Sequence, residues 1–462
     1  MIELVGVLGL ARSGKAAAKL ALASGSAVFA SDTGDDEGLS VAASQIRQAG
    51  GEAETGGHSA DRLAECDLLV VSPGIPPDVP VLRDESLRHV PRISELEFAF
   101  RHLSASVIAV TGTNGKTTVT AWAAHLLEEM GLDVAAAGNI GLALSEVAAW
   151  ERQPEWVVVE ASSYQLGGTA SFDPRVGVVT NLAPDHLDRY PDLASYYGDK
   201  ARLFQNASPA SVWVLNGEDP AVMELPGDAP GRRLLFRAET QPDPDEEGAW
   251  VGASGELVLR VGQTELALAR ADQLGLLGSH NRGNALAAAL AAYAATGHAE
   301  TLGPGLRSFA PLPHRLEPVA TVGGVLWVND SKATNVTSAR VSIEAMDRPT
   351  ILLLGGRHKG ESYKPLLQAF PGRVKVVLAY GEAADRITAE LTTTGVDRVE
   401  RVDGPLSAVV QRAARLADPG DAVLLAPACA SFDMFSDYEE RGTEYARLVR
   451  AMASDPSEAT DG

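Results

Sequence analysis

Short apolar runs alternate with helical patterns along most of the 462-residue chain. The runs predict buried strands, and the spacing of apolar residues between them predicts helices. Strands that alternate with helices indicate parallel sheets covered by helices, so the expected fold class is α/β. The main predicted strands are 2–8, 27–31, 67–71, 107–110, 156–160, 176–181, 325–329, 350–354, 374–380 and 422–426.

The pattern restarts twice, which predicts three domains, and the length agrees with about three domains. We place the boundaries at 1–95, 96–309 and 310–462, with Phe309–Pro313 as a linker. The stretch 224–270 is rich in Pro, Gly and acidic residues, and it predicts a small β excursion within the second domain.

Charge and composition exclude several classes of protein. The chain has 39 Lys and Arg against 61 Asp and Glu, a net charge of −22, which argues against nucleic-acid or anionic-membrane partners. Cys66 and Cys429 are too few for a disulfide framework or a zinc site. No apolar run reaches the roughly 18 residues of a membrane span. We therefore expect a cytoplasmic monomer that acts on small molecules.

Two stretches have the form of a phosphate-binding loop. Gly9–Lys15 matches G-x-x-x-x-G-K, but Ala16 follows where a hydroxyl should bind Mg²⁺. Val110–Thr118 lacks the leading glycine, yet it has Gly-Lys-Thr between a buried strand and a helix. Its glycines allow close backbone approach, and its helix N-terminus attracts phosphate. We interpret the second stretch as the nucleotide site and the first as a Rossmann-like diphosphate turn or a simple helix entry.

Polar residues at other predicted strand ends are candidates for metal and substrate chemistry. Glu160 ends an apolar strand where a P-loop enzyme places a metal-binding carboxylate, and His186 follows the next one. Considered alone, Lys200 on a predicted helix over 195–204 indicates a solvated lysine. The loops 329–335 and 354–360 carry basic residues after strands, where α/β sheets bind anionic ligands or where ordinary polar loops lie.

The scarcity of lysine adds weight to some of these positions. The chain has eight lysines, and four of them, Lys116, Lys200, Lys332 and Lys359, occupy these candidate segments. Lysine offers a compact ammonium group that can lose its proton when buried, unlike arginine.

Taken together, these motifs resemble those of the Mur ligases, the ATP-dependent amino-acid-adding enzymes of peptidoglycan synthesis. Thr111–Thr118 is similar to their P-loop, including the missing leading glycine, and the resemblance covers essentially the whole chain. The other matching motifs are Ala137–Gly141, Asp330–Asn335, Pro427–Asp433 and Tyr438–Gly442. The resemblance implies a Rossmann-like UDP-binding domain, a P-loop ATPase domain and a C-terminal Rossmann-like domain.

The resemblance also implies a reaction. ATP would phosphorylate the carboxylate of UDP-N-acetylmuramoyl-L-alanine, and the amine of D-glutamate would displace phosphate to form an amide. Phosphorylation supplies a leaving group, and water must be kept from the acyl phosphate. The implied cofactors are ATP and two Mg²⁺ ions, one of them held through a carbamylated Lys200.

Site residues follow from the resemblance by position. Those with a catalytic role would be Lys116, Glu160, His186, Lys200 and Lys332. ATP would contact Gly112, Thr113, Asn114, Gly115, Lys116, Thr117, Thr118, Asn281, Asn284, Arg315 and Asp330. The UDP substrate would contact Leu10, Ala11, Asp32, Thr33, Gly74, Asn139 and His186. D-Glutamate would contact Lys332, Thr334, Lys359, Ser431, Phe432 and Tyr438, and the metals Thr117, Glu160, His186 and Lys200.

One departure and three alternatives remain open from the sequence. Gly34 stands where the family pattern suggests a basic residue, and Arg12 is a candidate replacement. The alternatives are a sibling enzyme (another Mur ligase or a folate-type glutamate ligase), a P-loop regulatory protein and a dehydrogenase that uses Gly9–Gly14. The linker at Phe309–Pro313 is also the predicted hinge of a ligand-driven domain closure.

Overall fold

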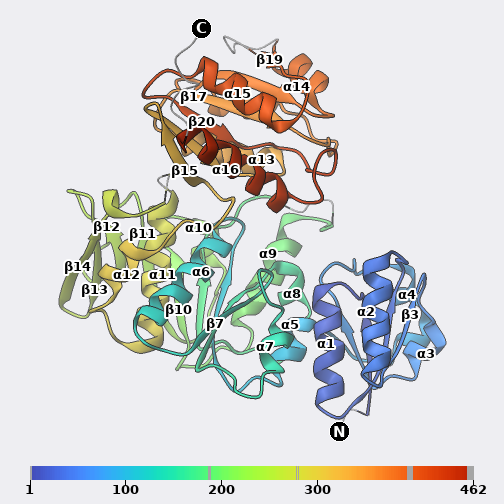
Figure 1. Ribbon diagram of the computed structural model, residues 1–462. Helices are drawn as coiled ribbons and strands as arrows, with labels where there is room; N and C mark the ends of the chain where they lie inside the picture. Colours follow the sequence, from blue (N-terminus) through green and yellow to red (C-terminus); the bar gives the residue numbers. More distant parts are fainter. Residues whose placement is uncertain (1–2, 186–188, 277, 279, 393–398, 455–462) are drawn as a thin grey trace. The chain divides into compact units, whose positions relative to one another are not determined.

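The computed structural model describes residues 3–185, 189–276, 278, 280–392 and 399–454. The described residues form three sheets, which fall within 1–95, 96–309 and 310–462, although the boundaries themselves stay a prediction. Two compact units result: residues 1–273 with 282–307, and residues 274–281 with 308–462 (Figure 1). The α/β fold class predicted from the alternating pattern is confirmed.

The first sheet is parallel, with the strand order β3-β2-β1-β4-β5. Its strands are β1 Leu4–Leu8, β2 Ala27–Asp32, β3 Glu52–Thr55, β4 Leu68–Val71 and β5 Arg92–Ser94. Its helices are α1 Arg12–Ala23, α2 Glu37–Gln48, α3 Ala60–Ala64 and α4 Pro80–Arg83. Helices α1 and α2 lie against the sheet (Figure 1), and the small side chains of α1 allow the close packing.

The second sheet has the order β14-β13-β12-β11-β10-β9-β6-β8-β7 and is parallel from β7 to β12. Its strands are β6 Ser106–Thr111, β7 Val134–Gly138, β8 Trp156–Glu160, β9 Val176–Val179, β10 Val212–Asn216, β11 Arg232–Arg237, β12 Gly248–Val251, β13 Glu256–Val261 and β14 Thr264–Arg270. The antiparallel pairs β12–β13 and β13–β14 are the predicted β excursion, which is confirmed.

Eight α-helices accompany the second sheet among the described residues. They are α5 Glu95–Phe100, α6 Lys116–Glu129, α7 Leu144–Ala148, α8 Ser163–Gly167, α9 Leu193–Ala201, α10 Pro220–Glu224, α11 His280–Thr296 and α12 Leu302–Ser308. Residues 285–292 of α11 are fully buried, because alanine and leucine occupy every side of that helix. Helix α1 contacts α5 and α7, and one apolar cluster joins the first and second sheets.

The third sheet has the order β15-β16-β20-β17-β18-β19, with only β15 antiparallel among these described strands. Its strands are β15 Glu317–Val322, β16 Val325–Asn329, β17 Thr350–Gly355, β18 Val374–Tyr380, β19 Val399–Arg401 and β20 Ala422–Leu425. Its helices are α13 Val336–Glu344, α14 Ala384–Leu391, α15 Leu406–Leu416 and α16 Tyr438–Ser454. The predicted strands 325–329 and 374–380 are confirmed to the residue.

Two sequence predictions about connections and membranes can be checked here. Residues 309–312, the core of the predicted linker, have no helix or strand. Within the described part of the chain, no helix is both long and apolar enough to cross a bilayer.

Candidate functional site

The loop between β6 and α6 folds back on its own lysine. The Nζ of Lys116 donates to the carbonyl oxygens of Gly112 (3.0 Å) and Thr113 (2.8 Å). Gly112 has a φ of +136°, and a Cβ there would collide with the hydroxyl of Thr180. Asn181, at the end of the neighbouring strand, accepts from the Asn114 amide at 2.9 Å. Residues 112–118 therefore form the compact phosphate-type loop that the sequence predicts.

Helix α6 begins at this loop without a side-chain cap. Its N-cap residue, Gly115, has a φ of +84°. A Cβ on Gly115 would meet the Oδ1 of Asn284, so only glycine lets α11 approach the loop this closely. Thr117 is half-buried in the first turn of α6, and Thr118 is buried. First-turn amides and the helix dipole favour an anion here. The loop has the geometry of a phosphate cradle.

Glu160 ends β8, the strand beside β6, and it is 2% exposed. One carboxylate oxygen, Oε1, accepts from Asn139 Nδ2 at 2.9 Å, and the Asn139 amide donates to the Glu160 carbonyl at 2.9 Å. The other oxygen, Oε2, is buried and has no hydrogen-bond partner among the described residues. A buried carboxylate oxygen without a partner is costly unless a cation or a donor meets it. Glu160 therefore fits the predicted metal-binding carboxylate.

Lys200 is 1% exposed, so the interpretation of it as a solvated helix lysine is wrong. Its Nζ donates to the Gly112 carbonyl at 2.8 Å and lies 4.6 Å from the ring centre of Tyr196. The pKa of Lys200 is lowered to about 6, first by burial and then by Lys116, against the opposing effect of Asp185, Glu160 and Asp199. Burial therefore favours the neutral amine, the form of lysine that can act as a nucleophile.

His186, a predicted substrate and metal ligand, lies outside the described residues. Among the described residues, no group of three or more His, Cys, Asp or Glu side chains could hold a metal ion. A P-loop site does not need such a cluster, because a hydroxyl, one carboxylate, phosphate oxygens and water complete the shell. Thr117 and Glu160 are donors of that kind.

The turn after β1 is held by Asp32. Its Oδ2 accepts from the Leu10 amide at 2.7 Å, and its Oδ1 accepts from the Gly34 amide at 2.9 Å. Both carboxylate oxygens therefore brace backbone, a use that the sequence did not suggest. The Leu10 side chain is buried in the core, so only its backbone borders the turn. Gly14 packs against the Gly9 carbonyl so closely that no Cβ fits there.

Three further residues predicted for the UDP substrate follow β1, β2 and β4 of this sheet. Ala11, Thr33 and Gly74 are exposed, and Ala11 is the N-cap of α1 with no side-chain hydrogen bond. Arg12 reaches the Asn139 loop, where it donates to the Asn139 carbonyl at 3.2 Å. The structure thus brings the first turn and Asn139 together.

In the second unit, Arg315 and Asp330 lie near each other. The pKa of Asp330 is raised to about 6, chiefly by burial, although the Ser342 hydroxyl, Arg315 and Lys332 favour its charged form. His314 and Leu316, on either side of Arg315, have φ values of +61° and +42°. Non-glycine residues in this region are strained, and such strain concentrates at functional sites.

Two predicted adenine-nucleotide residues lie at the start of α11. Asn281 and Asn284 are three positions apart, so they share one side of the helix, and they are 5% and 8% exposed. Burial and Arg315 lower the pKa of the neighbouring His280. Arg315 therefore lies near His280 in the second unit, and Asn284 borders the P-loop in the first.

The residues predicted for D-glutamate gather at the carboxyl ends of β16, β17 and β20. Lys359 donates to the Thr334 hydroxyl at 3.4 Å, and the ammonium of Lys332 lies 5.6 Å from the ring centre of Tyr438. Ser431 is 3% exposed, whereas Phe432 is 61% exposed. Two ammonium groups beside hydroxyls are a suitable site for a small dicarboxylate.

Arg441 fastens these loops together and is 1% exposed. Its Nε donates to the Ser331 hydroxyl at 2.9 Å, and its Nη2 donates to the Ser331 carbonyl at 2.9 Å and to the Cys429 carbonyl at 3.3 Å. The sequence motif contained this arginine without indicating a role. Its position shows that it links the loop after β16 to the loop after β20.

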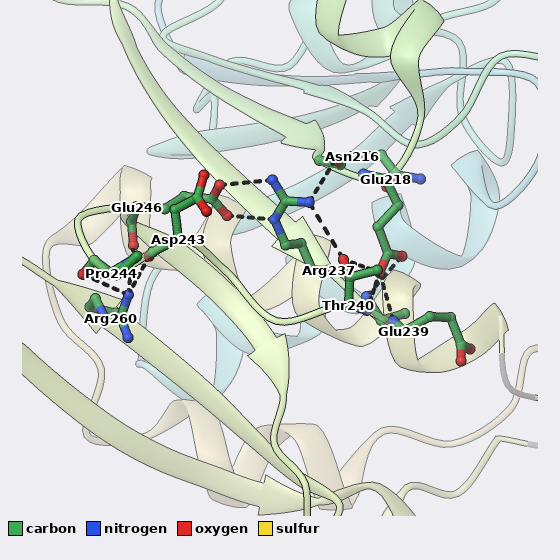
Figure 2. A network of polar contacts seen from close by, with 11 residues as sticks. Asn216, Glu218, Arg237, Glu239, Thr240, Asp243, Pro244, Glu246 and Arg260 are labelled. Carbon is green, nitrogen blue, oxygen red and sulfur yellow. Dashed lines mark hydrogen bonds and ion pairs between the residues drawn. The ribbon is translucent and has the colours of Figure 1, made fainter.

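A second polar network braces the far carboxyl ends of the central sheet (Figure 2). Glu218 accepts from the amides of Ala238, Glu239 and Thr240 at 3.0, 2.7 and 2.6 Å. Arg237 forms a two-point ion pair with Glu246 at 2.6 and 2.8 Å. The network fixes the turn after β11, whose Ala238 packs against Gly283 of α11. It escaped prediction because its members are ordinary surface residue types.

Tyr196 was also not identified from the sequence, although its spacing from Lys200 on α9 could have indicated that it is buried. It is 1% exposed, it lies four residues before Lys200 on α9, and its hydroxyl is 3.3 Å from the Thr113 hydroxyl. The i, i+4 spacing places both side chains on one face of the helix, so a buried Lys200 implies a buried Tyr196.

Family models match two parts of the chain. The Mur ligase middle domain matches residues 110–292, and the Mur ligase, glutamate ligase domain matches residues 314–429. The first match contains the P-loop, Glu160 and Lys200, and the second contains Asp330, Lys332 and Lys359.

Full-length relatives and solved structures agree with these matches. Three relatives are named UDP-N-acetylmuramoylalanine--D-glutamate ligase. The relative from Pelotomaculum thermopropionicum is 37% identical, and the match covers 96% of this chain and 97% of the relative. The relative from Salinibacter ruber is 38% identical with the same coverage of both chains. The relative from Anaeromyxobacter dehalogenans is 40% identical, and the match covers 97% of this chain and 98% of the relative. A pseudomurein peptide ligase type C from Methanothermus fervidus has a similar fold, with a TM-score of 0.59 at 17% identity, covering 97% of this chain and 100% of that one.

Proposed function

The chain belongs to the Mur ligase family, and from this premise we propose that it joins D-glutamate to UDP-N-acetylmuramoyl-L-alanine at the expense of ATP. One observation carries the proposal: relatives named UDP-N-acetylmuramoylalanine--D-glutamate ligase match 96–97% of the chain at 37–40% identity. The buried Glu160 and Lys200 and the half-buried Lys116, which lie around one phosphate-type loop, support the ATP-dependent part.

The proposed chemistry has two steps. The carboxylate oxygen of the L-alanyl group bonds to the γ-phosphorus of ATP, and the bond to the β–γ bridging oxygen breaks to release ADP. The amine nitrogen of D-glutamate then attacks the acyl carbon, the carbon–oxygen bond to phosphate breaks, and the amine loses a proton. Lys116, now on the Gly112 and Thr113 carbonyls, would turn to the β- and γ-phosphate oxygens.

Magnesium fits the residues beside the loop. Thr117 and Glu160 would hold one ion, and the partnerless Oε2 of Glu160 supports this assignment. A bound cation of this kind offsets the negative charge that moves during phosphoryl transfer. His186 and a carbamylated Lys200 would hold the second ion.

Carbamylation of Lys200 rests on its burial. The neutral amine nitrogen would bond to the carbon of CO₂, and one proton would leave, which converts an amine into a carboxylate. A lysine with a pKa of about 6 has its lone pair available at neutral pH. The ordinary lysine on a solvent-exposed helix face does not.

The substrates would divide among the remaining residues. Leu10, Ala11, Asp32, Thr33 and Gly74 would border the UDP group, with Asn139 and His186 at the muramoyl-alanine end. Asn281, Asn284, Arg315 and Asp330 would address the nucleoside of ATP. Lys332, Thr334, Lys359, Ser431, Phe432 and Tyr438 would receive D-glutamate. The two lysines near Thr334 and Tyr438 support the last group.

We also propose the boundaries 1–95, 96–309 and 310–462, a monomeric state and a cytoplasmic site of action. Light scattering on the purified chain tests the monomer.

Phosphate release tests the function. It should require ATP, Mg²⁺, UDP-N-acetylmuramoyl-L-alanine and D-glutamate together. Omission of any one should abolish it, and L-lysine, meso-diaminopimelate or a folate should not replace its counterpart. Turnover with another amino acid and none with D-glutamate would overturn the assignment.

A further inference from the structure

Arg189 connects the loop after β4 to the helices of the central sheet. Its Nη1 donates to the Pro73 carbonyl and its Nη2 to the Ile75 carbonyl, both at 3.1 Å. These two carbonyls flank Gly74, the residue that we assign to the UDP substrate. One planar guanidinium therefore fixes both sides of that turn.

The same guanidinium rests on an aromatic face. Its central carbon lies 3.9 Å from the ring centre of Tyr164, which is a cation–π contact. Tyr164 stacks on Tyr190, with the centroids 5.4 Å apart and the planes 5° from parallel. The Tyr190 hydroxyl donates to Asp199 of α9 at 2.8 Å, and this hydrogen bond anchors the Tyr190 ring to that helix.

The aromatic contacts continue to the phosphate-type loop through a tilted pair of rings. Tyr190 packs against Tyr196 with the centroids 5.3 Å apart. The Tyr196 hydroxyl is 3.3 Å from the Thr113 hydroxyl, and the Tyr196 ring faces the Lys200 ammonium group. An unbroken line of side chains therefore runs from the Pro73–Ile75 turn to Thr113. It passes through Arg189 and the three tyrosines.

We propose that Arg189 is a positioning residue, which sets the Pro73–Ile75 turn at a fixed place relative to the P-loop. The inference rests on the proposed function, because it assumes that the UDP substrate touches this turn. The carboxylate of that substrate must reach the γ-phosphate in line, and a displacement of about 1 Å costs roughly 100-fold in rate. The stacked tyrosines, which have few rotatable bonds, keep the distance between the two loops constant.

The test is steady-state kinetics on Arg189→Lys, which keeps the charge but loses the two-point fork and the flat face. We expect the KM for UDP-N-acetylmuramoyl-L-alanine to rise and kcat to fall by about tenfold or more, with the KM for ATP within about twofold of wild type. Tyr164→Leu should have the same effect as Arg189→Lys. Tyr164→Phe, which keeps the ring, should have wild-type kinetics.

Arg92→Lys is the matched control. Arg92 also donates to two carbonyls, those of Leu82 and Leu87, and both acceptors belong to the segment between β4 and β5 of the first sheet. Arg92→Lys should leave kcat and the KM values for both substrates near those of wild type. Wild-type kinetics for Arg189→Lys would overturn the proposal, and so would an equal loss in every constant together with a lowered melting temperature.

Failure of the proposed function can be distinguished from failure of the positioning role. If the wild-type chain shows no turnover with these substrates, the function is wrong, and positioning is then tested by hydrogen exchange of the segment 72–76. Faster exchange in Arg189→Lys and Tyr164→Leu, but not in Tyr164→Phe or Arg92→Lys, would support it. Unchanged exchange in all four variants would overturn it.

Discussion

Lys200 and Lys116 donate to the same carbonyl oxygen, that of Gly112, at 2.8 and 3.0 Å. Two ammonium groups so close repel each other, and this repulsion adds to burial in lowering the pKa of Lys200. Burial and this neighbour together favour the neutral amine form of Lys200.

Carbamylation of Lys200 is the first prediction. Isotopically labelled carbon dioxide should give a carbamate signal in the carbon NMR spectrum at pH 7–8, because the amine is neutral above its pKa of about 6. The signal should be absent in Lys200→Ala. Lys375→Ala is the control and should keep the wild-type signal. Hydrogen bonds to Asp418 and Asp421 raise the pKa of Lys375, so in the wild-type chain this amine stays protonated and should not react with carbon dioxide. A signal that survives Lys200→Ala contradicts the assignment.

Glu160→Gln should weaken the binding of the magnesium ion that we assign to Thr117 and Glu160. The variant keeps the size of the side chain and an oxygen for Asn139, but it removes the negative charge that would bind the ion. We expect ligation to fall by about 100-fold or more and MgATP binding to weaken, with metal-free ATP binding unchanged. Glu155→Gln, on the exposed residue just before the same strand, is the control and should behave as wild type. Equal activity in the two variants would exclude Glu160 as a metal ligand.

Asp330 makes the stability of the second unit depend on pH. Its pKa in the folded chain is about 6 against an ordinary 3.8, so the folded state binds more protons between these values. The free energy of unfolding should therefore fall as the pH rises through that window, by at most about 3 kcal/mol. Asp330→Asn should lose this fall and be more stable than wild type at pH 8, while nucleotide binding weakens.

Thermal melts at pH 4 and pH 8 measure this effect. Asp347→Asn, at a side chain that is 78% exposed in the same unit, is the control and should keep the wild-type dependence. If Asp330→Asn melts in parallel with wild type at both pH values, the buried carboxylate is not the cause.

Lys359→Ala should act on D-glutamate alone. Lys359 lies beside the Thr334 hydroxyl, in the group that we assign to the amino-acid substrate. Loss of a charged hydrogen bond to a carboxylate costs about 1.5–3 kcal/mol, so the KM for D-glutamate should rise by about ten- to a hundredfold. The KM for ATP should stay unchanged. Lys364→Ala, an exposed lysine five residues along, should have wild-type constants. An increase in the KM for ATP that matches the increase for D-glutamate would contradict this role.

Much of the site was predictable because short motifs follow strands. A Gly-Lys-Thr after β6 and a carboxylate at the end of β8 lie side by side once the two strands pair. The environment of each residue was not predictable. The sequence around Lys200 indicates an exposed helix, yet α9 packs this face against the P-loop. Asp32 holds the Leu10 and Gly34 amides, although its position suggested a ligand contact.

By itself, the sequence determined the order of strands and helices, the three α/β segments and the identity of the phosphate loop. These depend on local periodicity and on glycines whose backbone demands are local. Only the tertiary structure decided which charges are buried, which carboxylate oxygen lacks a partner and how Arg189 reaches Pro73. Burial and pairing arise between residues far apart in the chain, and a low-dielectric interior, not residue type, sets the pKa of Lys200 and Asp330.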